Sequence, residues 1–454
     1  MLLLTVAALV AVTMLVPAVV FAHHPDGEAK GSAPADSGDL ERWMNEDKQP
    51  PKSMKPRSHE PCVKGMAGPF PCENVGLESY LPLSVFGSER ANDIWGWTDP
   101  ATKKDYALIG LDDGTGFIDI SDTKRPVYLG KLPTQTASSI WRDIKVYNNH
   151  AFVVSEARGH GMQVFDLTRL RGQTEPQTWT VDAHYAEFGN AHNIAINEDT
   201  GFAYPIGSNT CEGGPHVVNI QNPTAPTFAG CIDEDGYTHD TQVVVYNGPD
   251  ERFQGREIAF SSNEDTLTIV DVTDKENPRQ LSRLPYDGAT YAHQGWLTED
   301  QSHFLLGDEV DELRLGHNTR TYIFDVSNLT DPVNTANHTA ETEAIDHNLY
   351  IKGNYVHQAN YRAGYRLLDG SNIENGELTE VGFFDIYPAD DDAQFNGAWS
   401  NFPYYDKNIV VVSGIEQGLF VLKPQLKGPG GGGPGSGPGG PPPGKGPGGP
   451  PGRR

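Results

Sequence analysis

The sequence has little positive charge, few cysteines and only one long apolar run. Lys and Arg number 34 against 61 Asp and Glu, which gives a formal net charge of −27 at pH 7. So large an acidic excess opposes nucleic acid or an anionic membrane as a partner. We also find no serine nucleophile elbow, no phosphate-binding loop and no paired glycosidase signature. Scattered catalytic carboxylates need no local motif, so that last absence excludes little.

The single long apolar run covers residues 2–22 and ends in Val20-Phe21-Ala22. Its small residues match a signal-peptidase site, so we expect residues 1–22 to be a signal peptide. The start lacks Lys and Arg, and an uncleaved membrane anchor is therefore the alternative. No later segment is long and apolar enough to span a bilayer. We expect a secreted, extracellular or periplasmic protein, in some settings associated with the cell surface.

Four cysteines fit an oxidising compartment, and the chain has no CxxC spacing that would favour a cysteine zinc site. Cys62 and Cys72 lie close together in a Gly/Pro-rich stretch. Cys211 and Cys231 lie at matching ends of two neighbouring predicted strands. Among three possible connectivities, we therefore expect the disulfides 62–72 and 211–231.

Internal repetition indicates the architecture. Strand-like stretches with a period near fifty residues open on polar side chains, which form one column: Asn92, Arg142, His192, His239, His293, His347 and Asn396. The next positions form a second column: Asp93, Asp143, Asn193, Asp240, Gln294, Asn348 and Gly397. These two columns define seven repeating units.

Each unit continues with further short strands. The third strand ends near a short polar side chain expected to capture backbone N–H groups of the next turn: Asp119, Asp166, Asn219, Asp271, Asp325 and Asp369. Four strands per unit and seven units predict an all-β, seven-bladed β-propeller over residues 75–424. The last unit lacks a fourth strand, which the segment from Val75 would supply. Six or eight blades are the alternatives if one unit is misjudged.

The flanking segments have no periodic pattern. We expect residues 23–74 to be a disordered or loop segment stapled by Cys62 and Cys72. Residues 425–454 are rich in Gly and Pro without a regular three-residue repeat, so we expect a disordered tail and not collagen.

In a propeller the two polar columns and the loops after the second strands share one face. Neutral imidazoles suit zinc, copper or iron, whereas carboxylates alone would suit calcium. The candidate ligands of a divalent cation, with iron, copper, zinc and calcium left open, are His192, His239, His293, His347, Asp240 and Glu309. The competing hypothesis is structural: His and Asn side chains tie neighbouring blades by bonding their backbones.

The remaining polar residues of this face are candidates for a ligand-binding rim: Asn92, Asp93, Arg142, Asp143, Asn193, Gln294, Asn348, Asn396, Glu156 and Glu416. Arg142 could bind an anion there. We favour instead a pair between Arg142 and a nearby carboxylate, Asp143 or Glu187.

Several motifs carry a resemblance to a known family. LTIVDVTD (267–274) resembles an LVIVD-type repeat, and CVKGMAGPFPC (62–72) resembles a Cys-bearing segment that precedes such repeats. Further matches are NDIWGW (92–97), WRDIKVY (141–147), HGMQVFDLT (160–168), GYTHD (236–240), HQGWLT (293–298), IDHNLY (345–350) and GLFVL (418–422). The chain resembles the secreted choice-of-anchor B proteins with propeller repeats. That resemblance implies an exported propeller and assigns no reaction.

We therefore expect a monomeric, exported binding or interaction module for an extracellular protein, a glycan or a small ligand, and a divalent cation at the channel mouth is one of the two hypotheses for its histidines. The alternative is a metal-dependent enzyme that uses the histidines of four consecutive blades. Nucleic acid is not an expected partner.

Overall fold

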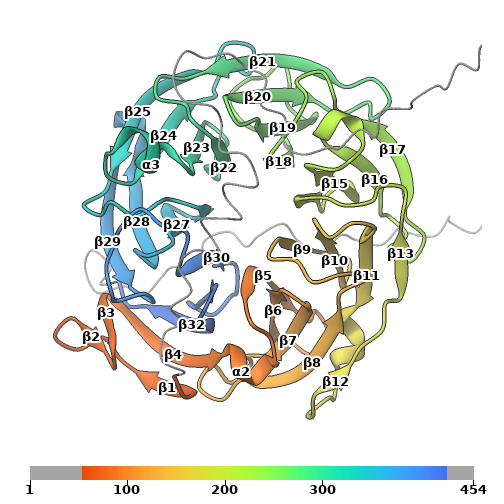
Figure 1. The fold of residues 1–454 in the computed structure, drawn as a ribbon. Coiled ribbons are helices and arrows are strands. Elements are labelled where there is room, and N and C mark those ends of the chain that lie inside the picture. Colours follow the sequence, from red (N-terminus) through yellow and green to blue (C-terminus); the bar gives the residue numbers. More distant parts are fainter. Residues whose placement is uncertain (1–53, 427–454) are drawn as a thin grey trace, which may run out of the picture.

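The computed structural model describes residues 54–426 and shows seven antiparallel β-sheets in a ring around a central channel (Figure 1). The predicted seven-bladed propeller with four-stranded blades is confirmed. The predicted signal peptide lies outside the described residues, as do residues 427–454 of the predicted tail.

The blades follow one another along the chain, and we number them in that order. Blade 1 contains β5 (Ala91–Thr98), β6 (Asp105–Leu111), β7 (Gly114–Asp119) and β8 (Val127–Pro133). Blade 2 contains β9 (Arg142–Tyr147), β10 (His150–Ser155), β11 (Met162–Asp166) and β13 (Ala183–Tyr185). Blade 3 contains β14 (Asn193–Asn197), β15 (Phe202–Ile206), β16 (His216–Asn219) and β17 (Thr227–Cys231). Blade 4 contains β18 (Asp240–Val245), β19 (Glu257–Ser262), β20 (Thr266–Asp271) and β21 (Arg279–Pro285).

The ring continues through three more blades. Blade 5 contains β22 (Ala292–Leu297), β23 (His303–Asp308), β24 (Arg320–Asp325) and β25 (Val333–Thr339). Blade 6 contains β26 (Asn348–Lys352), β27 (Tyr355–Ala359), β28 (Tyr365–Asn372) and β29 (Glu377–Phe384). Blade 7 contains β30 (Ala398–Phe402), β31 (Val410–Gly414), β32 (Gly418–Pro424) and β4 (Val75–Pro82). Short helical segments are α2 (Leu83–Phe86), α3 (Asp311–Leu315), η1 (Leu167–Leu170), η2 (Cys211–Gly213) and η3 (Ile373–Asn375).

The ring is closed as the sequence predicts. Strand β4, which precedes blade 1 in the chain, pairs antiparallel with β32 along its whole length, from Val75 opposite Pro424 to Pro82 opposite Gly418. Every residue of β4 is buried. This pairing joins segments from the two ends of the described chain and covers an edge of β32 that would otherwise be open.

The expectation of a loop or disorder before residue 75 is wrong for residues 57–60, 66–67 and 70–73. Three strands lie there: β1 (Arg57–Glu60), β2 (Met66–Ala67) and β3 (Phe70–Glu73). Strand β1 pairs with β4 and extends blade 7, whereas β3 pairs with β29 and extends blade 6. These strands are short and mostly lack alternating apolar residues, so their pairing depends on sheet edges that only the folded ring provides.

A second unpredicted strand extends blade 1. Strand β12 (Gln177–Thr178) lies in the connection within blade 2 and pairs parallel with β8. Gly130, with φ of 107°, makes this close approach possible, because a Cβ there would overlap the backbone of Gln177.

The core lies between blades, because each sheet packs against its neighbours on both faces. Strand β6 is buried along its whole length. Aromatic pairs join neighbouring blades: Phe117 and Phe165 stack with ring centroids 4.6 Å apart, and Phe260 and Phe304 with centroids 5.7 Å apart.

The turns after the third strands behave as predicted. In six blades a polar side chain accepts the backbone N–H two residues further on; it ends the third strand in five of them and lies within β28 in blade 6. These are Asp119, Asp166, Asn219, Asp271, Asp325 and Asp369.

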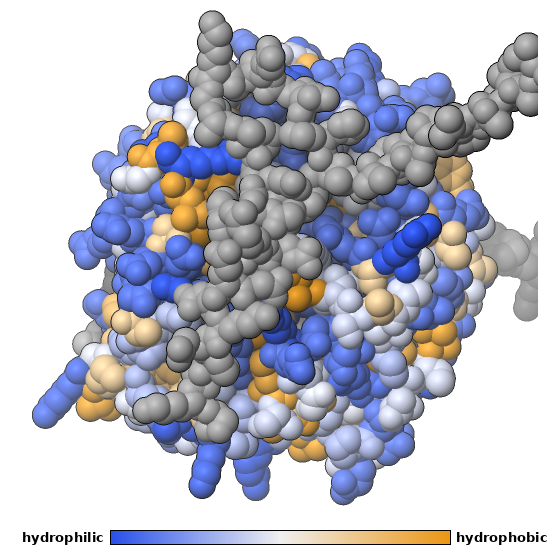
Figure 2. Space-filling model, in the orientation of Figure 1, coloured by the Kyte–Doolittle hydropathy of each residue, from blue (hydrophilic) through white to orange (hydrophobic). Residues whose placement is uncertain are grey.

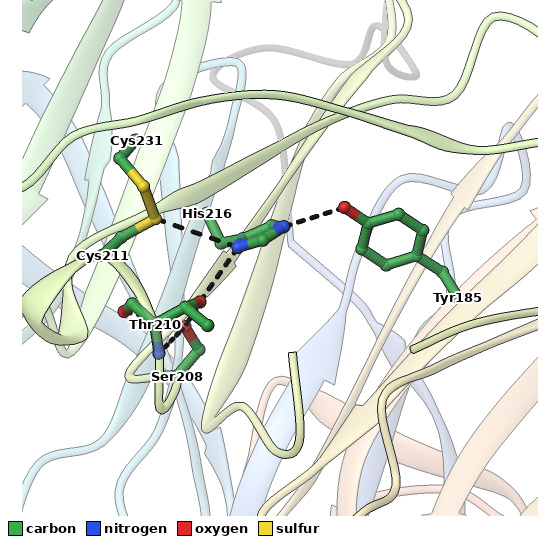
Figure 3. The surroundings of a disulfide bond; sticks show 6 residues. All are labelled: Tyr185, Ser208, Thr210, Cys211, His216 and Cys231. Carbon is green, nitrogen blue, oxygen red and sulfur yellow. Dashed lines mark hydrogen bonds between the residues drawn. A yellow bond between two sulfur atoms is a disulfide. The ribbon is translucent and has the colours of Figure 1, made fainter. Parts of the chain in front are cut away.

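Both predicted disulfides are confirmed. The Cα atoms of Cys62 and Cys72 are 5.9 Å apart, and those of Cys211 and Cys231 are 5.3 Å apart. The second disulfide lies beside His216, which binds the Tyr185 hydroxyl at 2.9 Å and the Thr210 hydroxyl at 2.9 Å (Figure 3). Burial lowers the pKa of His216 to about 4, so this imidazole is a neutral structural group.

Candidate metal centre at the channel mouth

The strand register places the predicted site residues on one face of the ring. At the mouth, first strands begin opposite the ends of second strands: Asp240 lies opposite Ser262, and Ala292 opposite Asp308. Glu309, the residue after β23, is thereby brought close to His293, the second residue of β22.

The four histidines of blades 3 to 6 form a continuous row. The ring centroids are 4.4 Å apart for His192 and His239, 4.2 Å for His239 and His293, and 4.5 Å for His293 and His347. Residues separated by roughly fifty positions in the sequence therefore meet, as the column pattern predicts. Whether an ion binds them stays a prediction.

Oxygen acceptors fix three of these rings through Nδ1. His239 Nδ1 donates to the backbone carbonyl of His293 at 3.0 Å, and His347 Nδ1 donates to the carbonyl of Trp399. His192 Nδ1 lies 2.5 Å from Oε1 of Glu156. A carbonyl or carboxylate demands a donor, so Nε2 carries the lone pair in the neutral form of each ring. Metal-binding imidazoles are oriented in this way.

Glu309 lies at the centre of the row. One ligand atom each from His239, His293 and Glu309 lies within 4.8 Å of the other two. Nε2 of His293 is 3.6 Å from Glu309 Oε2, and Nε2 of His347 is 3.5 Å from Glu309 Oε1. The hydroxyl of Tyr361 donates to Glu309 Oε1 at 2.6 Å and orients the carboxylate. Nδ1 of His293 is buried and has no hydrogen-bond partner among residues 54–426.

Burial controls the charges of the row. It lowers the pKa of His347 to about 3, and burial with the neighbouring imidazoles holds the pKa of His293 well below its usual range. Both rings are neutral at pH 7, the form that binds a metal ion without releasing a proton. Burial raises the pKa of Glu309 to about 7. For His192, burial favours a lower pKa, but the hydrogen bond and charge of Glu156 outweigh it and the pKa rises.

The accessible end of the row is the pair His192–Glu156. Their side chains are 11% and 20% exposed, compared with 3% for His293 and His347. On the face shown in Figure 2, hydrophilic residues predominate where described residues are visible, and hydrophobic residues form separate patches.

A second polar layer lies next to the histidines, and Asp240 belongs to it. Lys145 Nζ is 2.6 Å from Asp143 and 3.7 Å from Asp93, and its positive charge also acts on Asp240. Asp240 accepts the N–H of Thr241 at 2.6 Å and is absent from the converging group around Glu309. Its charge nevertheless acts on His192, and whether Asp240 is a ligand or an orienting partner of the histidine site stays a prediction.

The predicted rim residues are mostly buried between blades instead of standing on an exposed rim. The bonds to a neighbouring blade or its approach loop are Asn92 to Ile140 O, Ile144 N to Asp93, Ile194 N to Asp143, Asn193 to His239 O, and Leu349 N to Gln294. Asn396 donates to Glu416, and the buried Asn348 accepts at its carbonyl from Asn401. Blade-to-blade bonding to a neighbouring backbone is thus shown for the side chains of Asn92, Asp93, Asp143, Asn193 and Gln294, and for His239 and His347, but not for Asn396 or the side chain of Asn348.

Arg142 does not pair with Asp143 or Glu187, and that expectation is wrong. Its guanidinium is buried and donates to the carbonyl of Leu111 at 3.0 Å, to the hydroxyl of Thr134 at 2.8 Å and to His160 Nε2 at 2.9 Å. The carboxylate of Asp143 is instead occupied by Lys145 and backbone N–H groups.

Sequence reasoning missed two residues of this region. Lys145 neutralises the second layer, and its signal is a lysine two residues after Asp143 in a strand that lines the channel. Tyr361 positions Glu309, but it lies 52 residues away in the sequence and no local pattern connects the two.

No known family model matches the chain, and no curated protein matches it. Several solved structures resemble it. The β-propeller domain of Cps50 (Swd1) from Myceliophteria thermophila has a TM-score of 0.47 and 13% identity over 70% of this chain and 93% of that domain. A protein from Lactobacillus plantarum has a TM-score of 0.45, 15% identity and coverages of 71% and 88%. Hydrazine synthase of Kuenenia stuttgartiensis has a TM-score of 0.45, 12% identity and coverages of 70% and 92%. Likenesses this distant carry no argument about function.

Proposed function

We propose that this protein is an exported binding module whose channel mouth binds a divalent transition-metal ion through His239, His293 and Glu309. The observation that carries the proposal is the convergence of three ligand atoms within 4.8 Å, supplied by three different loop or strand ends. Two imidazoles and one carboxylate form a donor set that suits zinc or iron better than calcium, which prefers oxygen ligands.

The surroundings support this assignment. The anchored Nδ1 of His239, the carboxylate of Glu309 held by Tyr361 and the neutral ring of His293 are features that prepare a site for a metal ion. His347 and His192 extend the row on either side and are candidates for a further ligand. Three protein ligands leave at least one coordination position for water or for a lone pair of the bound partner.

The remaining features fit an exported protein. Two disulfides are rare in cytosolic proteins, and no helix within residues 54–426 is long and apolar enough to cross a membrane. The resemblance to choice-of-anchor B proteins supports the same compartment. Extracellular proteins, glycans or small ligands with an oxygen or nitrogen donor are the proposed partners.

Metal analysis of protein purified without an affinity tag tests the proposal. We expect one transition-metal ion in the channel-mouth site, lost in the double variant His239→Ala/His293→Ala. His357→Ala, which removes a buried imidazole outside the row, is the matched control and should retain the ion. An ion content that is unchanged in the double variant would contradict the proposal.

A metal-dependent enzyme is the second candidate, and the open coordination position favours it, because catalytic metal sites keep such a position. A bound redox-active metal together with substrate turnover that His239→Ala/His293→Ala abolishes would favour catalysis. A redox-inert ion, with partner binding that needs the ion and no turnover, would favour the binding module.

A further inference from the structure

A group of buried carboxylates lies behind the histidine row, where blades 5 and 6 meet. Asp311 and Glu312 lie in α3, the short helix between β23 and β24 (Figure 1). Asp346 precedes β26 of the next blade. The three residues are 0%, 3% and 1% exposed. Burial of three carboxylates is strongly unfavourable unless something neutralises them.

Part of each group is held by the protein. The hydroxyl of Tyr322 donates to Asp311 Oδ2 at 2.9 Å, and the N–H of Arg320 donates to Glu312 Oε1 at 3.1 Å. His317 Nδ1 donates to the carbonyl of Asn318 at 2.9 Å, which leaves its lone pair on Nε2. These bonds orient the side chains and leave their other atoms available.

The other atoms lack partners. Within residues 54–426, no hydrogen bond of good geometry reaches Asp311 Oδ1, Glu312 Oε2, His317 Nε2 or either side-chain oxygen of Asp346, although the backbone of Asp308 interacts with the Asp346 carboxylate. Five such atoms in one region are unusual, because buried polar groups are almost always satisfied.

The groups converge. One ligand atom each from Asp311, Glu312 and His317 lies within 4.8 Å of the other two, and His317 Nε2 is 3.5 Å from Asp311 Oδ2. Asp346 comes from the neighbouring blade, and its charge acts on that of Glu312. It packs against β23 at Gly307, where a Cβ would overlap its carboxylate.

Protons are the alternative to a cation. A proton shared by Asp311 and Glu312 would satisfy those two groups, but it would leave Asp346 and His317 Nε2 without partners. A cation between Asp311, Glu312 and His317 can satisfy these three groups together, and its charge also attracts the neighbouring Asp346.

We propose that Asp311, Glu312 and His317 bind a second divalent cation, with the negative charge of Asp346 beside them. Two carboxylates and one imidazole nitrogen favour Mn²⁺ or Zn²⁺, because Ca²⁺ and Mg²⁺ prefer all-oxygen sites. This site uses none of the ligands of the channel-mouth ion and stands independently of it. It lies next in sequence to both Glu309 and His347, so its ion would fix the two loops that carry them.

Titration of chelator-treated, tag-free full-length protein with MnCl₂ and with ZnCl₂ tests the proposal by calorimetry. We expect His239→Ala/His293→Ala to bind one ion still. Adding the near-isosteric Asp346→Asn should weaken this binding at least tenfold. His317→Gln, at a partly exposed position that tolerates change, should weaken it as well and gives a second variant if Asp346→Asn does not fold.

Four results would overturn the second site. The first is no ion bound by His239→Ala/His293→Ala protein that is folded by circular dichroism. The second is an affinity unchanged by both Asp346→Asn and His317→Gln. The third is binding of Ca²⁺ but neither Mn²⁺ nor Zn²⁺. The fourth is a folded Asp346→Asn protein that is more stable than the parent both with and without the ions, as proton sharing requires. Loss of the channel-mouth ion alone would leave all these readouts unchanged, so the two proposals fail separately.

Discussion

At the scale of single residues, Lys145 is the critical charge of the channel. It is buried with Asp143 at 2.6 Å and Asp93 at 3.7 Å, and their charges, despite burial, raise its pKa. We predict that Lys145→Met lowers the free energy of unfolding by about 3–5 kcal/mol, because it leaves two buried carboxylates unpaired. Chemical denaturation at pH 8 measures the loss.

The control is Lys131→Met, which removes a lysine paired with the partly exposed Asp113 at 2.6 Å. The free energy of unfolding should fall by less than about 1 kcal/mol in Lys131→Met. Without Lys145 the pKa of Asp143 rises, so the folded state takes up a proton before the unfolded state does as pH falls. The loss from Lys145→Met should therefore be smaller at pH 5 than at pH 8. Equal losses for the two variants, or a loss independent of pH, would contradict the prediction.

Single residues also show where sequence reasoning succeeded and failed. The four histidines were found because they recur at the same place in consecutive repeats, and the structure brings their rings within 4.5 Å. The carboxylates of α3 were missed because they lie in an insertion that no other unit shares. Four acidic residues between 308 and 312 were the available signal.

At the scale of elements, the closing strand β4 is expected to decide whether the ring forms. A chain beginning at Val75 lacks β1 to β3 and keeps β4, whereas a chain beginning at Leu83 lacks all four strands. Strand β4 buries Val75, Leu77 and Tyr80. At about 1.5–3 kcal/mol each, these side chains contribute an appreciable part of the roughly 5–15 kcal/mol that stabilises a typical domain.

We therefore predict that the chain beginning at Val75 is a monomer that unfolds cooperatively with reduced stability. The chain beginning at Leu83 should self-associate through the open edge of β32. Sedimentation velocity and denaturant titration distinguish the two. A monomeric, cooperatively folded chain from Leu83 would show that closure is dispensable.

Elements that belong to the repeat were predictable, and elements that depend on the assembled ring were not. The strands of each unit have apolar patterns of their own, and the turn residues after the third strands have a local mechanism. Strands β1, β3 and β12 instead form on the outer edges of sheets, which exist only after blades 1, 6 and 7 have folded.

At the scale of the whole molecule, seven similar blades carry an asymmetric channel. Histidines come from blades 3 to 6, and the proposed second cation site lies between blades 5 and 6. The repeat therefore supplies the scaffold, while substitutions in a few neighbouring blades supply the chemistry. A sequence repeat reveals the scaffold directly, but the chemistry depends on pairs such as Tyr361 and Glu309 that only the closed ring brings together.

The acidic interior also makes stability depend on pH. Burial raises the pKa of Glu309, Asp311 and Asp385 to about 7. Between about pH 4.5 and 7 the unfolded chain releases these protons while the folded metal-free protein keeps them. The buried histidines with lowered pKa act in the opposite direction, but the carboxyl groups with raised pKa, which include Asp240 and Glu264, outnumber them. The free energy of unfolding of chelator-treated protein should therefore fall as pH rises through this range.

Bound cations should reverse this trend. Metal ligands must be deprotonated, so an ion at Glu309 or Asp311 binds more tightly as pH rises and stabilises the folded state through its binding. We predict that Zn²⁺ or Mn²⁺ raises the denaturation midpoint more at pH 7.5 than at pH 5.5. The metal-free protein should itself be more stable at pH 5.5 than at pH 7.5. His357→Ala should behave like the parent, whereas His239→Ala/His293→Ala combined with Asp346→Asn should lose the cation effect. An equal cation effect at both pH values, or its persistence in the triple variant, would place the ions elsewhere.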